Sequence, residues 1–491
     1  MFRVYADANG DPADYSQNNV PLKPKHYLPV NIGGVQENDF AMILGYPGRT
    51  NRWMPAGGID QNVKFAYPAW VEGSKTSMDA MKKYMVKSDE INLIYASKYA
   101  GVANYWKNRQ GMIDALSKFG TAKSKAVQEA KFNKWANKKE NKAKYGNVVS
   151  NINKYYTLTN EKSRHDNYMM QLFRSSAFGT VSRGLGRQLE AYAKADATKR
   201  AQMKPRILEM VEGMHKELHL PAEKEMLAAQ LNLYAKKAGY SLAPIVEKLA
   251  KENNGDFTKY VNDAFDASIF TSVEKVKAFL ETPSEAMVTG DPLYVLTNDM
   301  LNHYNFRSQE LITAQNDFGA SFRLLVEGLR ESKIGEIKYP DANSTLRLTY
   351  GKVRSLPADK RNDASINNYT TLEGQVKKYK KGDAEFDLPT RVLEMNAAKD
   401  FGRYADKDGT LHVNFLTDND ITGGNSGSPV LNGKGELIGL AFDGNIEAMA
   451  GDVIFDSKLQ RTINVDIRYV LWVIDNFSGA KHIVDEMTIV K

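Results

Sequence analysis

The sequence predicts an α+β fold in which a large block of helices is inserted between two segments of β structure. Near both ends of the chain, apolar and polar residues alternate as they do in half-buried strands. Between these ends, from about residue 68 to residue 335, apolar residues recur at the spacing of one helix face. The second β segment also contains a turn of small residues, Gly423-Gly424-Asn425-Ser426-Gly427, followed by a predicted strand and hairpin.

Residues 1–67 form the first β segment of this prediction. Met1 to Ala6 alternates like a strand, and Phe40-Ala41-Met42-Ile43-Leu44 is a short apolar run. The run ends at Gly45-Tyr46-Pro47-Gly48, which is typical of a buried strand that enters a turn. Because the first strand begins with no helix cap or signal peptide before it, we expect the chain to be the C-terminal portion of a longer protein.

Residues 68–335 form the predicted helical block. Thr271-Ser272-Val273-Glu274 has the pattern of a capping box. Pro221 marks the start of another helix, which Gly239 ends. The apolar residues of that helix, Leu227, Leu231 and Tyr234, fall on one face and are expected to point into a core.

Lysines crowd one part of this block, and two aromatic residues, Phe132 and Trp135, lie among them. The lysines are Lys123, Lys125, Lys131, Lys134, Lys138, Lys139, Lys142 and Lys144. In a nucleic-acid-binding surface such lysines would contact phosphates and the rings would stack on bases. Alanines and glutamates dilute the run, so a solvated helix is favoured and no nucleic-acid partner is expected.

Residues 336–491 form the second β segment. Strand alternation returns at Leu346, Leu348 and Tyr350, and again at Leu411, Val413 and Phe415. Val430-Leu431, the turn Asn432-Gly433-Lys434-Gly435 and Leu437 to Phe442 predict strand, hairpin and strand. A final helix is expected from Ile467 to Phe477.

The octapeptide from Gly423 to Val430 is typical of the nucleophile loop of a chymotrypsin-type serine peptidase. Acyl transfer needs a serine hydroxyl on a tight turn, with backbone N–H groups directed at the developing oxyanion. Ser426 is the predicted nucleophile, and the N–H groups of Gly424 and Ser426 are the predicted oxyanion hole. We therefore predict a chymotrypsin-like double β-barrel, whose first barrel, in residues 1–67, is incomplete.

Such a serine also needs a histidine base and a carboxylate. The seven histidines are His26, His165, His215, His219, His303, His412 and His482, and none lies in the small-residue, strand-end setting expected of that base. His215 and His219 form an i, i+4 pair on a predicted helix, but a zinc site would need a third ligand. Asp406-Lys407-Asp408-Gly409 lacks the spaced glutamate of a calcium loop, so a turn is favoured and no metal is expected.

Several segments are specific enough to indicate a family: Met1 to Tyr5, Pro21 to His26, Gly45 to Arg52, Thr417 to Thr422 and Phe442 to Met449. With them, the whole chain resembles the bacterial dipeptidyl-peptidase 7 and 11 family, exo-acting serine peptidases of the chymotrypsin clan. The resemblance implies release of N-terminal dipeptides from oligopeptide substrates, no cofactor, a homodimer, and a periplasmic or cell-surface location. In that family the triad histidine and aspartate lie upstream of the strand that begins this chain, so the chain alone is expected to be nearly inactive.

The specificity residues are expected on the strand Gly439 to Gly444, because in this fold the strand after the nucleophile hairpin forms a wall of the S1 pocket. A carboxylate suits the cationic amine of a peptide, and Asp443 is well positioned for that role. The resemblance implies that Asn104, from the helical block, also holds the amine. It further implies an arginine at the position of Gly444 in the acidic-specific branch. Glycine therefore favours a hydrophobic P1 residue, as in dipeptidyl-peptidase 7.

Composition agrees with a large protein of at least two domains, since the chain has 491 residues and a formal net charge of +7. The absence of cysteine excludes disulfides and thiol chemistry. No apolar run approaches the roughly 20 residues of a membrane-spanning helix. Two alternatives stay open: a non-catalytic peptide-binding protein that uses Asn104, Asp443 and the S1 wall, and an Asp/Glu-specific dipeptidyl-peptidase.

Overall fold

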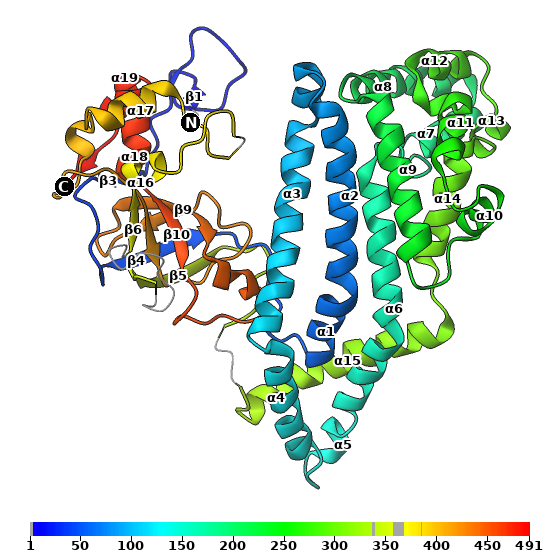
Figure 1. The fold of residues 1–491 in the computed structure, drawn as a ribbon, viewed down its shortest axis with the longest axis horizontal. Helices are drawn as coiled ribbons and strands as arrows, with labels where there is room; N and C mark the ends of the chain where they lie inside the picture. The colour runs from blue at the N-terminus through cyan, green and yellow to red at the C-terminus, as the bar shows by residue number, and fades with distance from the viewer. Residues whose placement is uncertain (1–2, 336–338, 357–367, 384) are drawn as a thin grey trace. The chain divides into compact units, whose positions relative to one another are not determined.

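The structure, a computed structural model, describes residues 3–335, 339–356, 368–383 and 385–491, and it divides into two compact units (Figure 1). The first unit joins Met1–Arg52 to Asp341–Lys491 and carries the strands that the structure describes, whereas the second, Trp53–Pro340, is helical. The predicted mixture of a helical block and β segments is therefore confirmed. Met1 and Phe2 of the first predicted strand, and residues 336–338 at the predicted domain boundary, lie outside the described residues.

The first unit is built on a sheet whose main path is antiparallel throughout. Its strand order is β5 (Arg347–Lys352), β4 (Phe40–Gly45), β8 (Pro429–Leu431), β9 (Leu437–Gly444), β10 (Thr462–Asp466), β7 (His412–Thr417) and β6 (Tyr369–Thr371). The strand β3 (Val30–Asn31) pairs in parallel with β9 and with β11 (Ile489–Val490). A separate hairpin joins β1 (Tyr5–Ala6) to β2 (Val20–Pro21).

The sheet curls until the ends of β5 and β7 meet. Val353, just after β5, bridges Thr417 in β7, and the N–H of Arg354 donates to the carbonyl of Leu416 at 3.0 Å. The interior holds Ala41 and Ile43 of β4, which are fully buried and pack with neighbours from β7, β8 and β9. β4 and the strands on either side of the nucleophile loop thus share one core.

The place of β4 differs from the predicted division of the chain. The sequence assigns residues 1–67 to the remnant of a separate barrel, but β4 lies between β5 and β8 in the same sheet as the serine loop. The segment after Arg52 belongs to the helical unit, where α1 (Ala56–Gln61) begins. A short apolar run does not reveal its partners, because strand pairing depends on segments far away in the sequence.

Short helices, including one near the C-terminus of the chain, pack against the sheet. The predicted helix over residues 467–477 is confirmed as α18 (Ile467–Trp472) continued by the π-helical turn η6 (Val473–Phe477). The indole of Trp472 is fully buried, and its N–H donates to the carbonyl of Asp400 at 2.8 Å. The other short helices of this unit are α16 (Leu372–Val376), α17 (Thr390–Ala397), η4 (Gly402–Tyr404), η5 (Ile446–Ala450) and α19 (Lys481–Asp485).

The second unit is a bundle around long helices that pack side by side. These are α2 (Tyr67–Met85), α3 (Asp89–Lys118), α6 (Val148–Ser175) and α9 (Leu220–Lys237), with α15 (Gln309–Glu331) against α6. Leu227, Leu231 and Tyr234 are fully buried, which confirms the predicted core face of α9. The remaining helices are η1 (Asn62–Ala66), α4 (Thr121–Ala136), α5 (Lys142–Tyr145), α7 (Leu185–Lys194), α8 (Ala197–Lys216), α10 (Pro244–Glu252), α11 (Thr258–Ala267), η2 (Ile269–Thr271), α12 (Val273–Glu281), α13 (Glu285–Thr289) and α14 (Pro292–Asn305).

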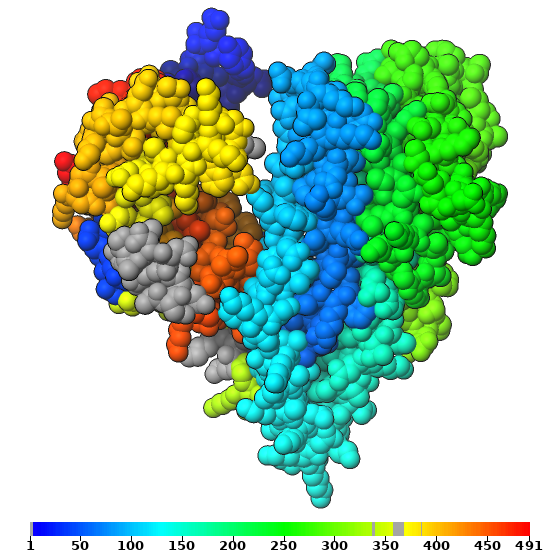
Figure 2. Space-filling model, in the orientation of Figure 1, coloured from blue at the N-terminus to red at the C-terminus, as the bar shows by residue number. Residues whose placement is uncertain are grey.

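The lysine-rich stretch forms α4 and α5, the cyan tip of the helical unit in Figure 2. Phe132 is fully buried, and Trp135 packs beside it against Tyr145, with ring centroids 5.0 Å apart. Phe132 is thus part of the core, and Trp135 is a partly buried ring packed beside it. Among the described residues, every helix is too short or too polar to cross a membrane.

The N-cap of α12 provides a test of local helix stability. Ser272 Oγ accepts hydrogen bonds from the N–H groups of Glu274 and Lys275 at 3.1 and 3.3 Å. Ser272→Ala should therefore lower the stability of α12 by about 1 kcal/mol. Ser284→Ala is the matched control, because Ser284 caps α13 without a side-chain hydrogen bond. Amide hydrogen exchange in the two helices measures both effects, and equal losses would contradict this role of Ser272.

Candidate active site

The loop that carries Ser426 lies along strand β9. The N–H of Gly427 donates to the carbonyl of Ala441 at 2.7 Å, and the N–H of Ala441 donates to the carbonyl of Ser428 at 2.9 Å. Ser426 is exposed, and its hydroxyl donates to the carbonyl of Phe442 at 3.3 Å. The predicted nucleophile is thus a solvent-accessible side chain held against β9.

Close backbone packing explains the glycine at position 424. Gly424 has φ +105°, and a Cβ there would lie 2.4 Å from the carbonyl oxygen of Tyr46. The adjacent residue, Gly423, accepts a hydrogen bond from the N–H of Gly48 at 2.7 Å. The sequence indicates a glycine turn, but only the structure shows that the turn between Gly45 and Gly48 packs against it.

The N–H groups of Gly424 and Ser426 are available to an anion. The neighbouring N–H groups of Asn425, Gly427 and Ser428 all donate to backbone carbonyls. Among the described residues, no acceptor is found for the N–H of Gly424 or Ser426. Donors that no protein group occupies are what an oxyanion hole requires, since they must bind the charge that develops during acyl transfer.

Asp443 and Gly444 end the strand that supports Ser426. Asp443 directly follows Phe442, whose carbonyl accepts the Ser426 hydroxyl. The Asp443 side chain is exposed, and its Oδ1 accepts from the N–H of Gly444 at 2.7 Å. The structure therefore brings Ser426, Asp443 and Gly444 to one end of β9.

Ala448 is a neighbour of Gly444 that the sequence did not reveal. The chain turns after β9 into η5, and a Cβ on Gly444 would lie only 2.7 Å from the Cβ of Ala448. The turn is held by Asn445, whose side-chain amide donates to the carbonyl of Leu459 at 2.8 Å. A side chain at position 444 therefore needs a shift of η5.

Asn104 lies in the other unit, exposed on α3. The next residue, Tyr105, packs its ring 6.3 Å from that of Trp70, and the Arg174 guanidinium lies over both rings. The role of Asn104 in binding a peptide amine stays a prediction.

The histidines of the first unit are His26, His412 and His482. His26 is exposed in the segment after β2, His482 is in α19, and His412 begins β7. No hydrogen bond among the described residues joins Ser426 to an imidazole. His215 and His219 do not share a helix as predicted, because α8 ends at Lys216 and His219 is the N-cap of α9.

Asp406, Asp408 and His412 have ligand-type atoms within 4.8 Å of one another, so we considered them as a metal site. Asp406 Oδ2, however, already accepts from the Arg468 guanidinium at 2.5 Å. A cation bound here would meet that positive charge and lose one carboxylate oxygen to it. Burial lowers the pKa of His412, whose ring stacks on Tyr369 at 3.7 Å between centroids. We interpret the group as part of an ion-pair network around Arg468.

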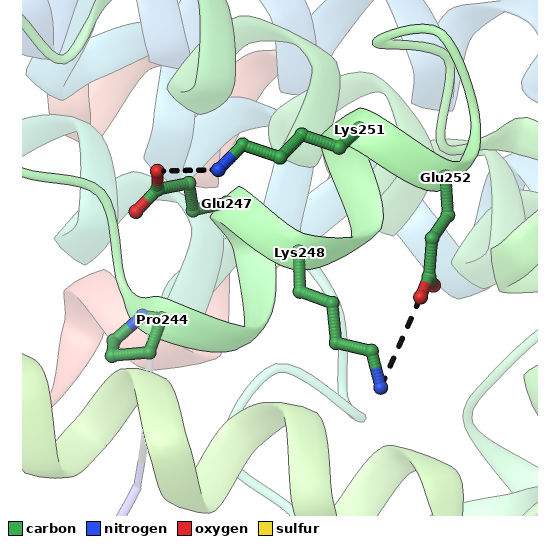
Figure 3. Close-up of a pocket in the computed structure, with 5 residues that line it drawn as sticks. All are labelled: Pro244, Glu247, Lys248, Lys251 and Glu252. Atoms are coloured by element: carbon green, nitrogen blue, oxygen red, sulfur yellow. Dashed lines mark hydrogen bonds and ion pairs between the residues drawn. The ribbon is translucent and has the colours of Figure 1, made fainter.

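A shallow pocket on α10 also has no features of a binding site (Figure 3). Its charged residues pair along the helix, with Lys251 Nζ 2.9 Å from Glu247 and Lys248 Nζ 3.9 Å from Glu252. Such i, i+4 pairs are typical of a solvated helix face.

Comparison with known proteins shows extensive similarity. The family model for peptidase S46 matches residues 1–489. A dipeptidyl-peptidase 7 from Capnocytophaga gingivalis is 55% identical over 494 residues, which cover 100% of this chain and 68% of that protein. An Asp/Glu-specific dipeptidyl-peptidase from the same organism is 34% identical, over 100% of this chain and 69% of that protein. The crystal structure of Porphyromonas endodontalis DPP11 in complex with the dipeptide Arg-Glu has a TM-score of 0.86 at 30% identity, covering 100% of this chain and 70% of that chain.

The packing of the serine loop leads to a prediction with a matched control. Gly424→Ala should distort the loop, because a Cβ at φ +105° would meet the Tyr46 carbonyl. The expected cost is about 1–3 kcal/mol. Gly423→Ala should have little effect, because a Cβ there meets nothing within 4 Å. Thermal unfolding and hydrogen exchange of residues 423–428 measure both, and equal behaviour of the two variants would contradict the packing argument.

Proposed function

Because the chain belongs to the peptidase S46 family, we propose that it is the serine-bearing part of a dipeptidyl-peptidase that releases dipeptides from the N-terminus of oligopeptides. Ser426 attacks the scissile carbonyl, and the N–H groups of Gly424 and Ser426 bind the oxyanion. The observation that carries this proposal is the position of the Ser426 hydroxyl against the Phe442 carbonyl, one residue before Asp443.

An enzyme that releases dipeptides must bind the peptide amine at a fixed distance from the scissile bond. A carboxylate at a fixed distance from the nucleophile can do so, because it forms a charge-assisted hydrogen bond with the ammonium group. We propose that Asp443 has this role and that Asn104 assists it. Two observations support the assignment: the Asp443 carboxylate is exposed, and Asp443 lies in β9, the strand that supports Ser426.

We propose that the P1 residue is hydrophobic. Gly444 adds no charge to the end of β9, and Phe442 and Ile446 beside it are exposed apolar side chains. The two Capnocytophaga relatives support this branch, since the one named dipeptidyl-peptidase 7 is the more similar. Asp/Glu specificity is the alternative, because the solved relative binds the dipeptide Arg-Glu.

The resemblance of the sequence motifs supports further parts of the proposal. The histidine base and its carboxylate come from polypeptide outside these 491 residues, and the curled sheet is the serine-bearing barrel of a chymotrypsin-like pair. The whole protein is exported to the periplasm or cell surface and acts as a homodimer on oligopeptides.

Hydrolysis of dipeptidyl reporters tests this function. We expect the product of the complete reading frame at this locus to cleave free-amine reporters and to lose that activity in Ser426→Ala. The 491-residue chain alone should be nearly inactive, since proton transfer needs a base within roughly 2.6–3.2 Å. Binding of reporters without hydrolysis by either form would favour the peptide-binding alternative.

The same assay tests amine recognition. Asp443→Asn keeps an acceptor for the Gly444 N–H but removes the charge, so kcat/KM should fall by a factor equivalent to about 2–5 kcal/mol. Glu447→Gln is the control, because this neighbouring carboxylate accepts from Asn445 at 2.9 Å and has no proposed contact with substrate. Equal cleavage of N-blocked and free reporters by the parent would exclude this role of Asp443.

P1 selectivity is tested by changing Gly444 and Ala448 together. Gly444→Arg alone should destabilise η5, because the new Cβ would lie 2.7 Å from that of Ala448. Adding Ala448→Gly should relieve the clash and move the ranking of kcat/KM from Leu and Met toward Asp and Glu at P1, since the guanidinium pairs with a carboxylate. A parent that already prefers Asp or Glu would overturn the hydrophobic assignment, and an unchanged ranking would remove Gly444 from S1.

A further inference from the structure

One buried arginine connects the two loops that flank the proposed site. Arg52 is 5% exposed, and its Nη1 and Nη2 donate to the two carboxylate oxygens of Asp420, each at 2.8 Å. Its Nε donates to the carbonyl of Gly451 at 2.7 Å. The guanidinium also lies over the ring of Phe455, with 5.7 Å from its carbon to the centroid.

These partners lie at the bases of the two loops. Asp420 leads directly into the nucleophile loop that ends at Ser426, and Gly451 directly follows η5, which packs over Gly444. The residue before the arginine, Asn51, donates its N–H to the carbonyl of Asp452 at 2.6 Å. The Asp452 carboxylate in turn accepts from the hydroxyl of Thr422.

The backbone at Arg52 is itself anchored. Its N–H donates to Asp341 Oδ1 at 2.8 Å, and the same oxygen accepts from the hydroxyl of Thr50 at 2.5 Å. The arginine therefore extends from a fixed point of the backbone, and its side chain has little freedom to follow a loop that moves.

We propose that Arg52 is a positioning residue that fixes the nucleophile loop relative to the S1 turn, and so sets the distance between Ser426 and the side chain at P1. This inference rests on the proposed function. An arginine suits the task because its planar fork offers Nε to one segment and two parallel donors to a carboxylate of another. Lysine has a single nitrogen and cannot hold both partners in that geometry.

Hydrogen exchange tests the positioning role in the 491-residue chain, without any need for activity. In Arg52→Lys, amides of residues 418–428 and 446–453 should exchange about tenfold faster, the factor that corresponds to loss of one charge-assisted hydrogen bond. Asp420→Asn, which keeps the shape of the partner, should accelerate the same two segments. Arg403→Lys is the matched control, because Arg403 pairs with Asp475 at 3.3 Å on another part of the unit.

Exchange that is unchanged in both loops, or that rises throughout the unit, would overturn the proposal, since the second result indicates a general loss of stability. In a form that hydrolyses reporters, Arg52→Lys should also alter KM and the ranking of P1 residues, whereas Arg403→Lys should leave both unchanged. If the product of the complete reading frame hydrolyses no reporter, the proposed function is wrong, while the exchange result still decides whether Arg52 holds the two loops.

Discussion

The pairing of β4 with β5 and β8 is the interaction on which the candidate site depends. This pairing places residues 45–52, which follow β4, next to the serine loop, which lies much later in the sequence. Three close contacts follow from that pairing. The turn at Tyr46 packs against Gly424. The N–H of Gly48 donates a hydrogen bond to the carbonyl of Gly423. The Arg52 guanidinium pairs with the Asp420 carboxylate. Gly424 and Gly427 have positive φ, which glycine adopts readily, and the segment that follows β4 packs closely against this turn.

Strand β9 contains or contacts the residues of the candidate site. It holds the serine loop through Ala441 and Phe442, presents Asp443, and ends at Gly444. Asp443 and Gly444 thus lie on the same strand that accepts the Ser426 hydroxyl, which favours a fixed distance from Ser426 to both residues. A larger residue at position 444 would have to move the turn that contains Ala448.

In the helical unit, one buried carboxylate joins three segments through hydrogen bonds. Glu223 of α9 is 1% exposed, and it accepts from the Tyr95 hydroxyl of α3 at 2.8 Å and from the Ser176 hydroxyl after α6 at 2.8 Å. A buried carboxylate is tolerated only when its oxygens are hydrogen-bonded. Because the hydrogen bond between Tyr95 and Glu223 fixes α3 against α9, an exposed residue of α3 such as Asn104 lies on a firmly held helix.

The sequence by itself determined the features that depend on neighbours along the chain. The glycine turn that carries Ser426 was predicted because turn chemistry is local, and the core face of α9 was predicted because Leu227, Leu231 and Tyr234 follow the helix period. Only the tertiary structure decided that β4 belongs to the sheet of the serine and that Arg52 meets Asp420. Those contacts join segments whose separation along the chain carries no periodic signal, so they exist only once strands have paired and loops have packed.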